Sequence, residues 1–220
     1  MRTQTKAALG IGAALAAILA ALIILLVVNP DGDEPAASAE TGEDSVLVRS
    51  DSHVLGEEGD SGVTFVEFLD FECEACGAVF PVVEQLREDY SGRVTFVARY
   101  FPLEGHFNSE RAARAVESAA RQGEFEAMYQ KMYETQSTWA EAQVPKDDVF
   151  RGFAEELGLD LEQYDADYAS EEVLARVRKD VADGESLGVQ GTPTIYVDGE
   201  LFQPESVQDF YDTLDEALAK

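Results

Sequence analysis

The placement of the cysteines constrains this chain more than any other feature of its sequence. The 220 residues contain two cysteines, Cys73 and Cys76, and both belong to one C-x-x-C motif. Residues 63–69 (VTFVEFL), which precede the motif, are rich in β-branched and aromatic side chains, as is typical of a strand buried on both faces. From residue 78 to residue 86, apolar side chains recur at helical spacing. The cysteine pair is therefore predicted to lie where a buried strand gives way to a helix.

Three kinds of chemistry use a cysteine pair of this spacing. As a structural disulfide it would close a loop of about four residues, which the chain-entropy model assigns about 2 kcal/mol, against about 3 kcal/mol for a fifteen-residue loop. A zinc site needs two further ligands, and the two histidines, His53 and His106, do not have ligand-like spacing. We therefore expect thiol-disulfide exchange, with no metal and no cofactor beyond a redox-active Cys73–Cys76 disulfide.

The start of the predicted helix gives the first cysteine a specific role. Unpaired backbone N–H groups and the positive end of the helix dipole stabilise a thiolate there, so we expect Cys73 to be the nucleophile and the leaving group. Cys76, one turn further on, is expected to be the resolving thiol. Glu72 and Glu74 oppose the thiolate by like charge. The expected pKa of Cys73 is thus below the free value of about 8.5, but less extreme than in the strongest oxidants of this chemistry.

Glu67 is the second candidate site residue. A carboxylate in the middle of a strand buried on both faces is costly, which suggests a purpose. Glu67 precedes Cys73 by six positions, so it is expected one layer of the sheet below the cysteines, where it would relay the proton of Cys76. In the alternative, Glu67 reaches an edge of the sheet or pairs with a cation such as Arg99.

The third candidate element is the sequence Gly-Thr-Pro-Thr at residues 191–194, just before a predicted strand. Proline cannot donate a hydrogen bond to a sheet, so Pro193 is expected at a turn or at the start of the strand. From the pattern alone, the trans form of the Thr192–Pro193 bond is favoured over the cis form.

A long apolar segment lies near the N-terminus. Residues 7–28 contain no charged side chain, and about 22 residues at 1.5 Å each span roughly 33 Å, which matches the hydrocarbon core of a bilayer. We expect a transmembrane helix retained as an anchor. The alternative is a cleaved signal peptide, with cleavage near residues 37–39 (Ala-Ser-Ala), but its apolar region is usually about 7–15 residues long.

Charges around this segment set its expected orientation. Arg2 and Lys6 precede it and acidic residues follow it, so the positive-inside rule places residues 1–6 in the cytoplasm. The rest of the chain is then expected outside the cytoplasm, where disulfides form and persist.

The net charge of −28 limits the possible partners. Binding of nucleic acid requires clustered Lys and Arg and is therefore not expected. The acidic surface either keeps the protein soluble or reflects adaptation to high external salt, which would screen its self-repulsion.

Hydrophobic periodicity divides the remainder of the chain. A flexible acidic linker is expected at residues 30–44 and a loop at 53–61. Strands are expected at residues 45–49, 63–69, 94–100, 194–197 and 201–203, the last two joined by a turn at Asp198-Gly199. Four or five helices are expected between residues 108 and 187, and one more at 207–218. Six large side chains of this helical region are expected in its core rather than in a substrate groove, namely Phe125, Met128, Tyr129, Met132, Tyr133 and Trp139.

Together these motifs resemble the DsbA-like branch of the thioredoxin superfamily. The resemblance runs from about residue 63 to the C-terminus and is carried by V-E-F-x-D-F-x-C-x-x-C at 66–76, Y-F-P-L at 100–103 and G-V-Q-G-T-P-T at 188–194. It implies an α/β thioredoxin-like fold with an all-helical insertion domain, here preceded by a single N-terminal transmembrane helix. The implied division is 1–6 cytoplasmic, 7–28 anchor, 29–60 linker and lead-in strand, 61–107 first thioredoxin-like part, 108–187 insertion and 188–220 second part.

The resemblance also implies roles for individual residues. It implies that Thr192–Pro193 is a cis peptide beside Cys73, that the Thr192 backbone pairs with a substrate strand, and that Glu67 is the buried acid beneath the cysteines. The helical insertion is implied to cover the active site. A histidine often follows F-P-L in relatives, but for His106 a packing role ahead of the next helix is preferred.

One departure from the family pattern concerns the direction of electron flow. The dipeptide Glu74-Ala75, which tunes the redox potential, lacks the His or Tyr common in relatives. We expect an oxidase that takes electrons from reduced exported proteins and is reoxidised by a quinone-linked membrane protein, with a monomeric soluble domain. An extracytoplasmic reductase, isomerase or thiol carrier using the same cysteines is the nearest alternative, and a tethered peptide-binding chaperone is an alternative of a different class.

Overall fold

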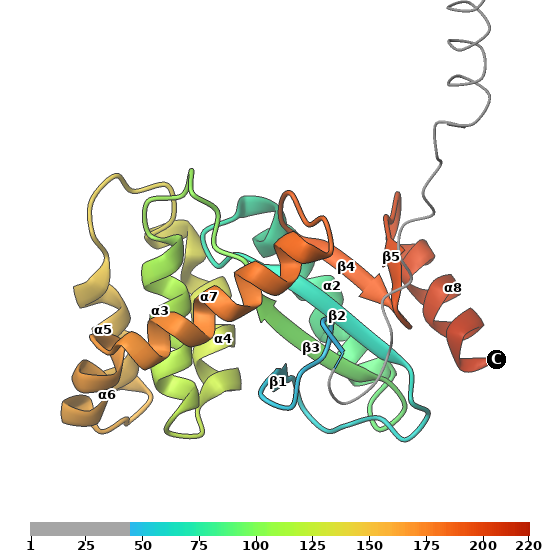
Figure 1. The fold of residues 1–220 in the computed structure, drawn as a ribbon, viewed down its shortest axis with the longest axis horizontal. Helices are drawn as coiled ribbons and strands as arrows, with labels where there is room; N and C mark the ends of the chain where they lie inside the picture. Colours follow the sequence, from blue (N-terminus) through green and yellow to red (C-terminus); the bar gives the residue numbers. More distant parts are fainter. Residues whose placement is uncertain (1–44) are drawn as a thin grey trace, which may run out of the picture. The chain divides into compact units, whose positions relative to one another are not determined.

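A computed structural model describes residues 45–220 and contains one five-stranded sheet (Figure 1). The strand order is β1-β3-β2-β4-β5. Strands β2 and β3 are parallel, whereas the other neighbours are antiparallel. The strands are β1 (His53–Val54), β2 (Thr64–Leu69), β3 (Thr95–Tyr100), β4 (Thr194–Val197) and β5 (Glu200–Phe202).

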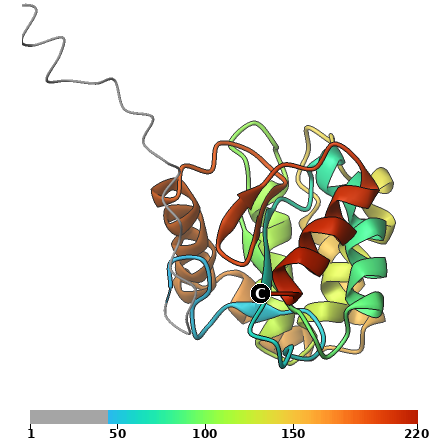
Figure 2. The same ribbon diagram turned by 90° about the vertical axis from the view of Figure 1, so that its right-hand side faces the viewer.

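The central strands are buried on both faces, as their apolar sequences predict. In β2, Phe65 and Leu69 belong to one hydrophobic cluster, whereas Val66 and Phe68 belong to a second. This alternation follows from the two-residue period of a strand. Helices α2 (Glu74–Asp89) and α8 (Val207–Leu218) cover the first face, and α7 covers the second (Figure 2).

A helical region occupies the stretch between β3 and β4. Its α-helices group beside the sheet, and α7 runs back along the sheet face (Figure 1). The six large side chains expected in its core are all buried. The elements are α3 (Ser109–Ala120), α4 (Phe125–Thr135), the 3-10 helix η1 (Gln136–Thr138), α5 (Asp147–Glu156), α6 (Leu161–Tyr168) and α7 (Glu171–Ser186).

The lead-in strand was predicted in the wrong place. Residues 45–49 form bends, and the edge strand is β1, inside the stretch predicted as loop. The reason is a buried cation: the guanidinium of Arg99 donates hydrogen bonds to the carbonyl oxygens of Val46 and Leu47. These carbonyls are therefore occupied by a side chain rather than by a neighbouring strand.

The C-terminal hairpin differs from its prediction by one residue. The backbone of Asp198 has a φ of 50° and that of Gly199 has a φ of 85°, which is the two-residue turn that matches strand twist. Pairing therefore begins directly between Val197 and Glu200, and β5 starts one residue earlier than expected. Strand β4 and helix α8 have the predicted ranges.

The predicted cytoplasmic end (1–6), transmembrane anchor (7–28) and acidic linker (30–44) lie outside the described residues. Within residues 45–220, no helix has the length and apolar character needed to cross a membrane.

Candidate active site

The two cysteines lie at the junction between β2 and α2. Cys73 is the N-cap residue of α2, with extended backbone angles, and Cys76 is one turn inside the helix. Both thiols are free. Cys73 is 7% exposed and Cys76 is 1% exposed, so an incoming sulfur reaches Cys73 more readily.

The surroundings of Cys73 favour its thiolate. The pKa of Cys73 is lowered to about 5, chiefly because the thiol of Cys76 donates a hydrogen bond to it. Burial opposes this effect, whereas the backbone N–H groups of Cys76 and Ala75 add to it. These N–H groups belong to the first turn of α2, which is the contribution predicted from the sequence.

The surroundings of Cys76 favour its thiol. Burial raises the pKa of Cys76 well above its ordinary value, and the hydrogen bond to Cys73 and the negative charge of Glu67 raise it further. The two sulfurs are therefore driven into different protonation states although they share one helical turn. A thiolate beside a proton donor is the arrangement that thiol-disulfide exchange requires.

Glu67 lies in the middle of β2, between Ala98 of β3 and Ile195 of β4. It is 4% exposed. Burial raises the pKa of this carboxyl to about 8, and the charge of Cys73 contributes to the shift. A carboxyl with this pKa exchanges its proton near neutral pH.

The alternative partner considered for Glu67 is wrong. Arg99 lies on the opposite face of the sheet, where it pairs with Asp180 at 2.7 Å and Asp183 at 2.6 Å. Its guanidinium also sits over the ring of Phe68, which belongs to the second hydrophobic cluster. Glu67 and Phe68 are neighbours in β2, so their side chains point to opposite faces. Arg99 shares the face of Phe68 and is therefore separated from Glu67 by the sheet.

The helical region holds the backbone of the active-site turn. The amide of Gln136, in η1, donates hydrogen bonds to the carbonyl oxygens of Phe71 at 2.8 Å and Cys73 at 2.9 Å. The buried carboxylate of Glu72 accepts a hydrogen bond from the backbone N–H of Asn108, at the start of α3. Sequence reasoning identified neither Gln136 nor the contact of Asn108 with Glu72, because each contact joins residues more than thirty positions apart in the chain.

Gly77 makes room for this contact. A Cβ atom at position 77 would lie 2.1 Å from Oε1 of Gln136, closer than two atoms approach without a bond. The glycine therefore allows the side chain of Gln136 to pass between η1 and the first turn of α2.

The loop before β4 lies against the first cysteine. The Sγ atom of Cys73 is 3.4 Å from the carbonyl oxygen of Thr192. The Thr192–Pro193 peptide bond is cis. A cavity of about 400 Å³ adjoins this loop, and its lining includes Thr192, Tyr196 and Leu201.

His106, for which a packing role was preferred, contacts a buried acid of the active-site turn. Its Nδ1 atom is 2.6 Å from Oδ2 of Asp70, which is 1% exposed. Asp70 was not identified from the sequence as a site residue, although it begins the D-F-x-C segment that follows β2.

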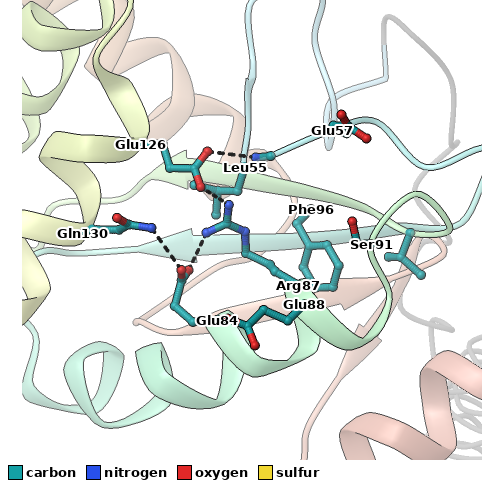
Figure 3. Close-up of a pocket in the computed structure, with 11 residues that line it drawn as sticks. Leu55, Glu57, Glu84, Arg87, Glu88, Ser91, Phe96, Glu126 and Gln130 are labelled. Carbon is teal, nitrogen blue, oxygen red and sulfur yellow. Dashed lines mark hydrogen bonds and ion pairs between the residues drawn. The ribbon is translucent and has the colours of Figure 1, made fainter.

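A second cavity, of about 320 Å³, contains neither cysteine (Figure 3). Arg87 of α2 crosses it to pair with Glu84 of the same helix and with Glu126 of α4. Glu126 also accepts a hydrogen bond from the backbone N–H of Gly56, at 3.1 Å. These contacts join α2, the helical region and the segment after β1, so we assign this cavity a structural role.

Comparison with known proteins decides the family. Residues 49–216 match the family model described as thioredoxin. The chain belongs to this family. This match covers the sheet, the cysteine turn and the helical region together.

Solved structures of the thioredoxin family place the chain in its DsbA-like branch, as the motifs predict. A thioredoxin-like oxidoreductase from Silicibacter pomeroyi DSS-3 is 31% identical, with a TM-score of 0.63, and the match covers 77% of this chain and 93% of that one. BdbD from Bacillus subtilis in its oxidised form is 25% identical, with a TM-score of 0.70, and the match covers 83% and 99%. The predicted relationship to DsbA-like thiol-disulfide oxidoreductases is confirmed by these neighbours.

Curated relatives carry the thioredoxin-family segment within a longer chain. The Na(+)/H(+) antiporter NhaA 1 of Mycobacterium sp. (strain KMS) is 36% identical over 153 residues, which are 67% of this chain and 24% of the antiporter. NhaA 3 of Salinispora tropica is 37% identical over 148 residues, which are 67% of this chain and 22% of that protein. The chain thus spans about a quarter of the length of these relatives.

Proposed function

We propose that this chain is a membrane-tethered, extracytoplasmic thiol-disulfide oxidase that introduces disulfides into exported proteins through Cys73 and Cys76. One observation carries the proposal: two cysteines one helical turn apart have pKa values displaced in opposite directions, that of Cys73 to about 5 and that of Cys76 well upward. The first is suited to attack and departure as a thiolate, and the second to holding a proton.

The reaction begins with the Cys73–Cys76 disulfide. A substrate thiolate attacks the Cys73 sulfur, a mixed disulfide forms, and the Cys76 sulfur leaves and takes up a proton. A second substrate thiolate then attacks the substrate sulfur of the mixed disulfide and expels Cys73 as a thiolate. The substrate has lost two electrons and gained a disulfide, and the protein holds these electrons as the Cys73 thiolate and the Cys76 thiol.

Glu67 supplies the proton route in this scheme. Its carboxyl has a pKa of about 8, and its charge acts on Cys76, so the two groups compete for one proton. Glu67 gives a proton to the Cys76 sulfur when the disulfide opens and recovers it when the disulfide closes again.

The substrate binds beside the loop before β4. The carbonyl of Thr192 already reaches Cys73, so an extended substrate segment laid along Thr192 and Pro193 brings its own cysteine to the same sulfur. Such a segment would be held by main-chain hydrogen bonds, which depend little on the substrate's side chains. This suits an enzyme that accepts many exported proteins.

The low pKa of Cys73 favours the oxidising direction. A stabilised thiolate stabilises the reduced protein and therefore makes the disulfide form a stronger oxidant. A quinone-linked membrane protein would take the two electrons and restore the disulfide. The dipeptide Glu74-Ala75 carries no positive charge, so it does not strengthen this tendency.

The proposed location rests on the sequence. Residues 7–28 are long enough to cross a bilayer, and Arg2 and Lys6 orient the segment with the catalytic part outside the cytoplasm. A monomer is the proposed state of the catalytic part.

The equilibrium with glutathione tests the direction of electron flow. An oxidase is expected to have a reduction potential of about −120 mV, whereas a value of about −270 mV would assign the chain to the reductase alternative. If the chain is instead a peptide-binding chaperone, the original chain does not oxidise dithiol substrates. Cys73→Ser would then leave its suppression of substrate aggregation unchanged. Loss of oxidation of a reduced dithiol peptide in Cys73→Ser supports the redox function.

A further inference from the structure

A buried acid joins the active-site turn to the loop that precedes α3. One carboxylate oxygen of Asp70 accepts a hydrogen bond from the N–H of Glu72 at 2.8 Å, and the other accepts from the N–H of Leu103 at 3.0 Å and lies 2.6 Å from Nδ1 of His106. The backbone carbonyl of Asp70 accepts from the N–H of Cys73 at 3.1 Å. His106 is thus linked to Cys73 through a single residue.

The groups that face His106 are acidic. Asp70 contacts the imidazole, and the charges of Cys73 and Glu72, from the same active-site turn, also act on it. The nearby cation Arg111 of α3 has other partners: it donates to the carbonyl of Phe107, lies over the Phe107 ring and pairs with Asp147 at 3.3 Å. The imidazole is about one quarter exposed, so it exchanges protons with solvent.

These neighbours favour the charged imidazole. Burial opposes the charge, but the hydrogen bond and the charge of Asp70 outweigh it, and Cys73 and then Glu72 add to the rise in the pKa of His106. Burial raises the pKa of Asp70 to about 6, so above that pH its carboxylate is available as the partner. Attraction between two charges is mutual, so an imidazolium that Cys73 stabilises also stabilises the Cys73 thiolate.

We propose that His106, held by Asp70, is a positioning residue that places a positive charge beside the active-site turn and thereby stabilises the Cys73 thiolate and the reduced state of the protein. It supplies the cation that Glu74 and Ala75 do not. When the disulfide forms, the thiolate charge disappears and His106 holds its proton less tightly. Reduction by two electrons therefore yields the Cys73 thiolate and the Cys76 thiol, and draws part of one further proton to His106. This inference deepens the proposed redox function and rests on it.

The test uses the full-length chain with three substitutions. His106→Gln removes the charge but keeps a hydrogen-bond donor toward Asp70, and His106→Lys restores a positive charge. His53→Gln is the matched control, since His53 is the other histidine of the chain and its Nε2 also lies 2.6 Å from a carboxylate, that of Glu117, but it lies on β1. Two quantities are measured: the pKa of the Cys73 thiol by ultraviolet titration and the equilibrium with glutathione.

We expect His106→Gln to raise the pKa of Cys73 by about half a unit, which lowers the thiolate-to-thiol ratio about threefold at a given pH. The equilibrium with glutathione should move toward the oxidised protein by a similar factor, while His106→Lys and His53→Gln behave as the original chain. No change in His106→Gln would overturn the proposal, and equal shifts in His106→Gln and His106→Lys would assign His106 to packing alone. If the original chain does not exchange with glutathione while the pKa still moves in His106→Gln, the proposed function fails and the role of the charge stands.

Discussion

The sulfur of Cys73 lies 3.4 Å from the carbonyl oxygen of Thr192, although 119 positions separate the two residues. The contact exists because β2 and β4 are antiparallel neighbours, so the end of one strand meets the beginning of the other. The cysteine and the loop before β4 therefore form one site. The helical region, which lies between them in the sequence, contacts the active-site turn from another side.

Replacement of Glu67 by Gln is expected to change how stability depends on pH. The carboxyl has a pKa of about 8 when folded, against 4.5 for an ordinary glutamate, so the folded state binds more protons than the unfolded state between these values. The contribution of Glu67 to stability is thus fully present below about pH 4.5 and is lost as the pH rises through 8, by an amount on the order of 3 to 5 kcal/mol.

The measurement is the free energy of unfolding of the reduced protein from pH 5 to pH 9. Glu67→Gln should show a flatter dependence than the original chain, because the amide does not titrate. Equal slopes in the two proteins would mean that Glu67 is solvated or paired, and the proton route through it would be wrong.

Replacement of Gly77 by Ala is expected to destabilise the protein and disturb the turn. The new Cβ would meet Gln136, so the two hydrogen bonds to Phe71 and Cys73 are strained or lost, at a cost of about 2 to 3 kcal/mol. Gly152→Ala is the matched control, since Gly152 is also helical and has no atom within 4 Å of the added Cβ.

Urea denaturation of both variants separates the contact from helix propensity. Gly152→Ala should be neutral or stabilising by up to about 1 kcal/mol. In the double variant Gly77→Ala, Gln136→Ala, the clash is removed, so the combined loss should be smaller than the sum of the single losses. Additive losses would show that Gly77 and Gln136 do not act on each other.

Replacement of Asp180 by Asn is expected to be among the most damaging single changes. Asp180 and Arg99 are both fully buried. Removing the acid leaves the Arg99 guanidinium with Asp183 alone and also takes an acidic partner from Arg176, at a cost of about 3 to 5 kcal/mol. Asp165→Asn is the control, because its two hydrogen bonds with Arg151 have similar distances but lie in solvent. A large loss in Asp180→Asn and almost none in Asp165→Asn is expected in thermal melts. Similar losses of stability in the two variants would contradict the view that burial makes the Arg99–Asp180 pair important.

The sequence predicted the parts of this protein that depend on local pattern. The runs of β-branched and aromatic residues at 63–69 and 94–100 identified the central strands, and the strand-to-helix junction identified Cys73 and the direction of its pKa shift. The two-residue turn at Asp198-Gly199 predicted the hairpin to within one position. In each case the signal and the structure it causes lie within a few residues of each other.

The parts that the sequence did not predict depend on contacts across the fold. Arg99 was considered as a partner of Glu67, but the two residues point to opposite faces, and the strand register that decides this is not visible in the chain. Gln136 gives no local sign that it binds the backbone of Cys73. The segment at 45–49 has the composition of a strand, yet Arg99 occupies its carbonyls.

The proposed chemistry depends most directly on the unequal protonation of two sulfurs within one turn of α2. Iodoacetamide labelling of the reduced full-length chain, followed at each site as a function of pH, measures this inequality. We predict that Cys73 is alkylated with a midpoint near pH 5 and that Cys76 stays unmodified through pH 8. Labelling of both cysteines with midpoints at or above about 8.5, or of neither at any pH, would contradict the account.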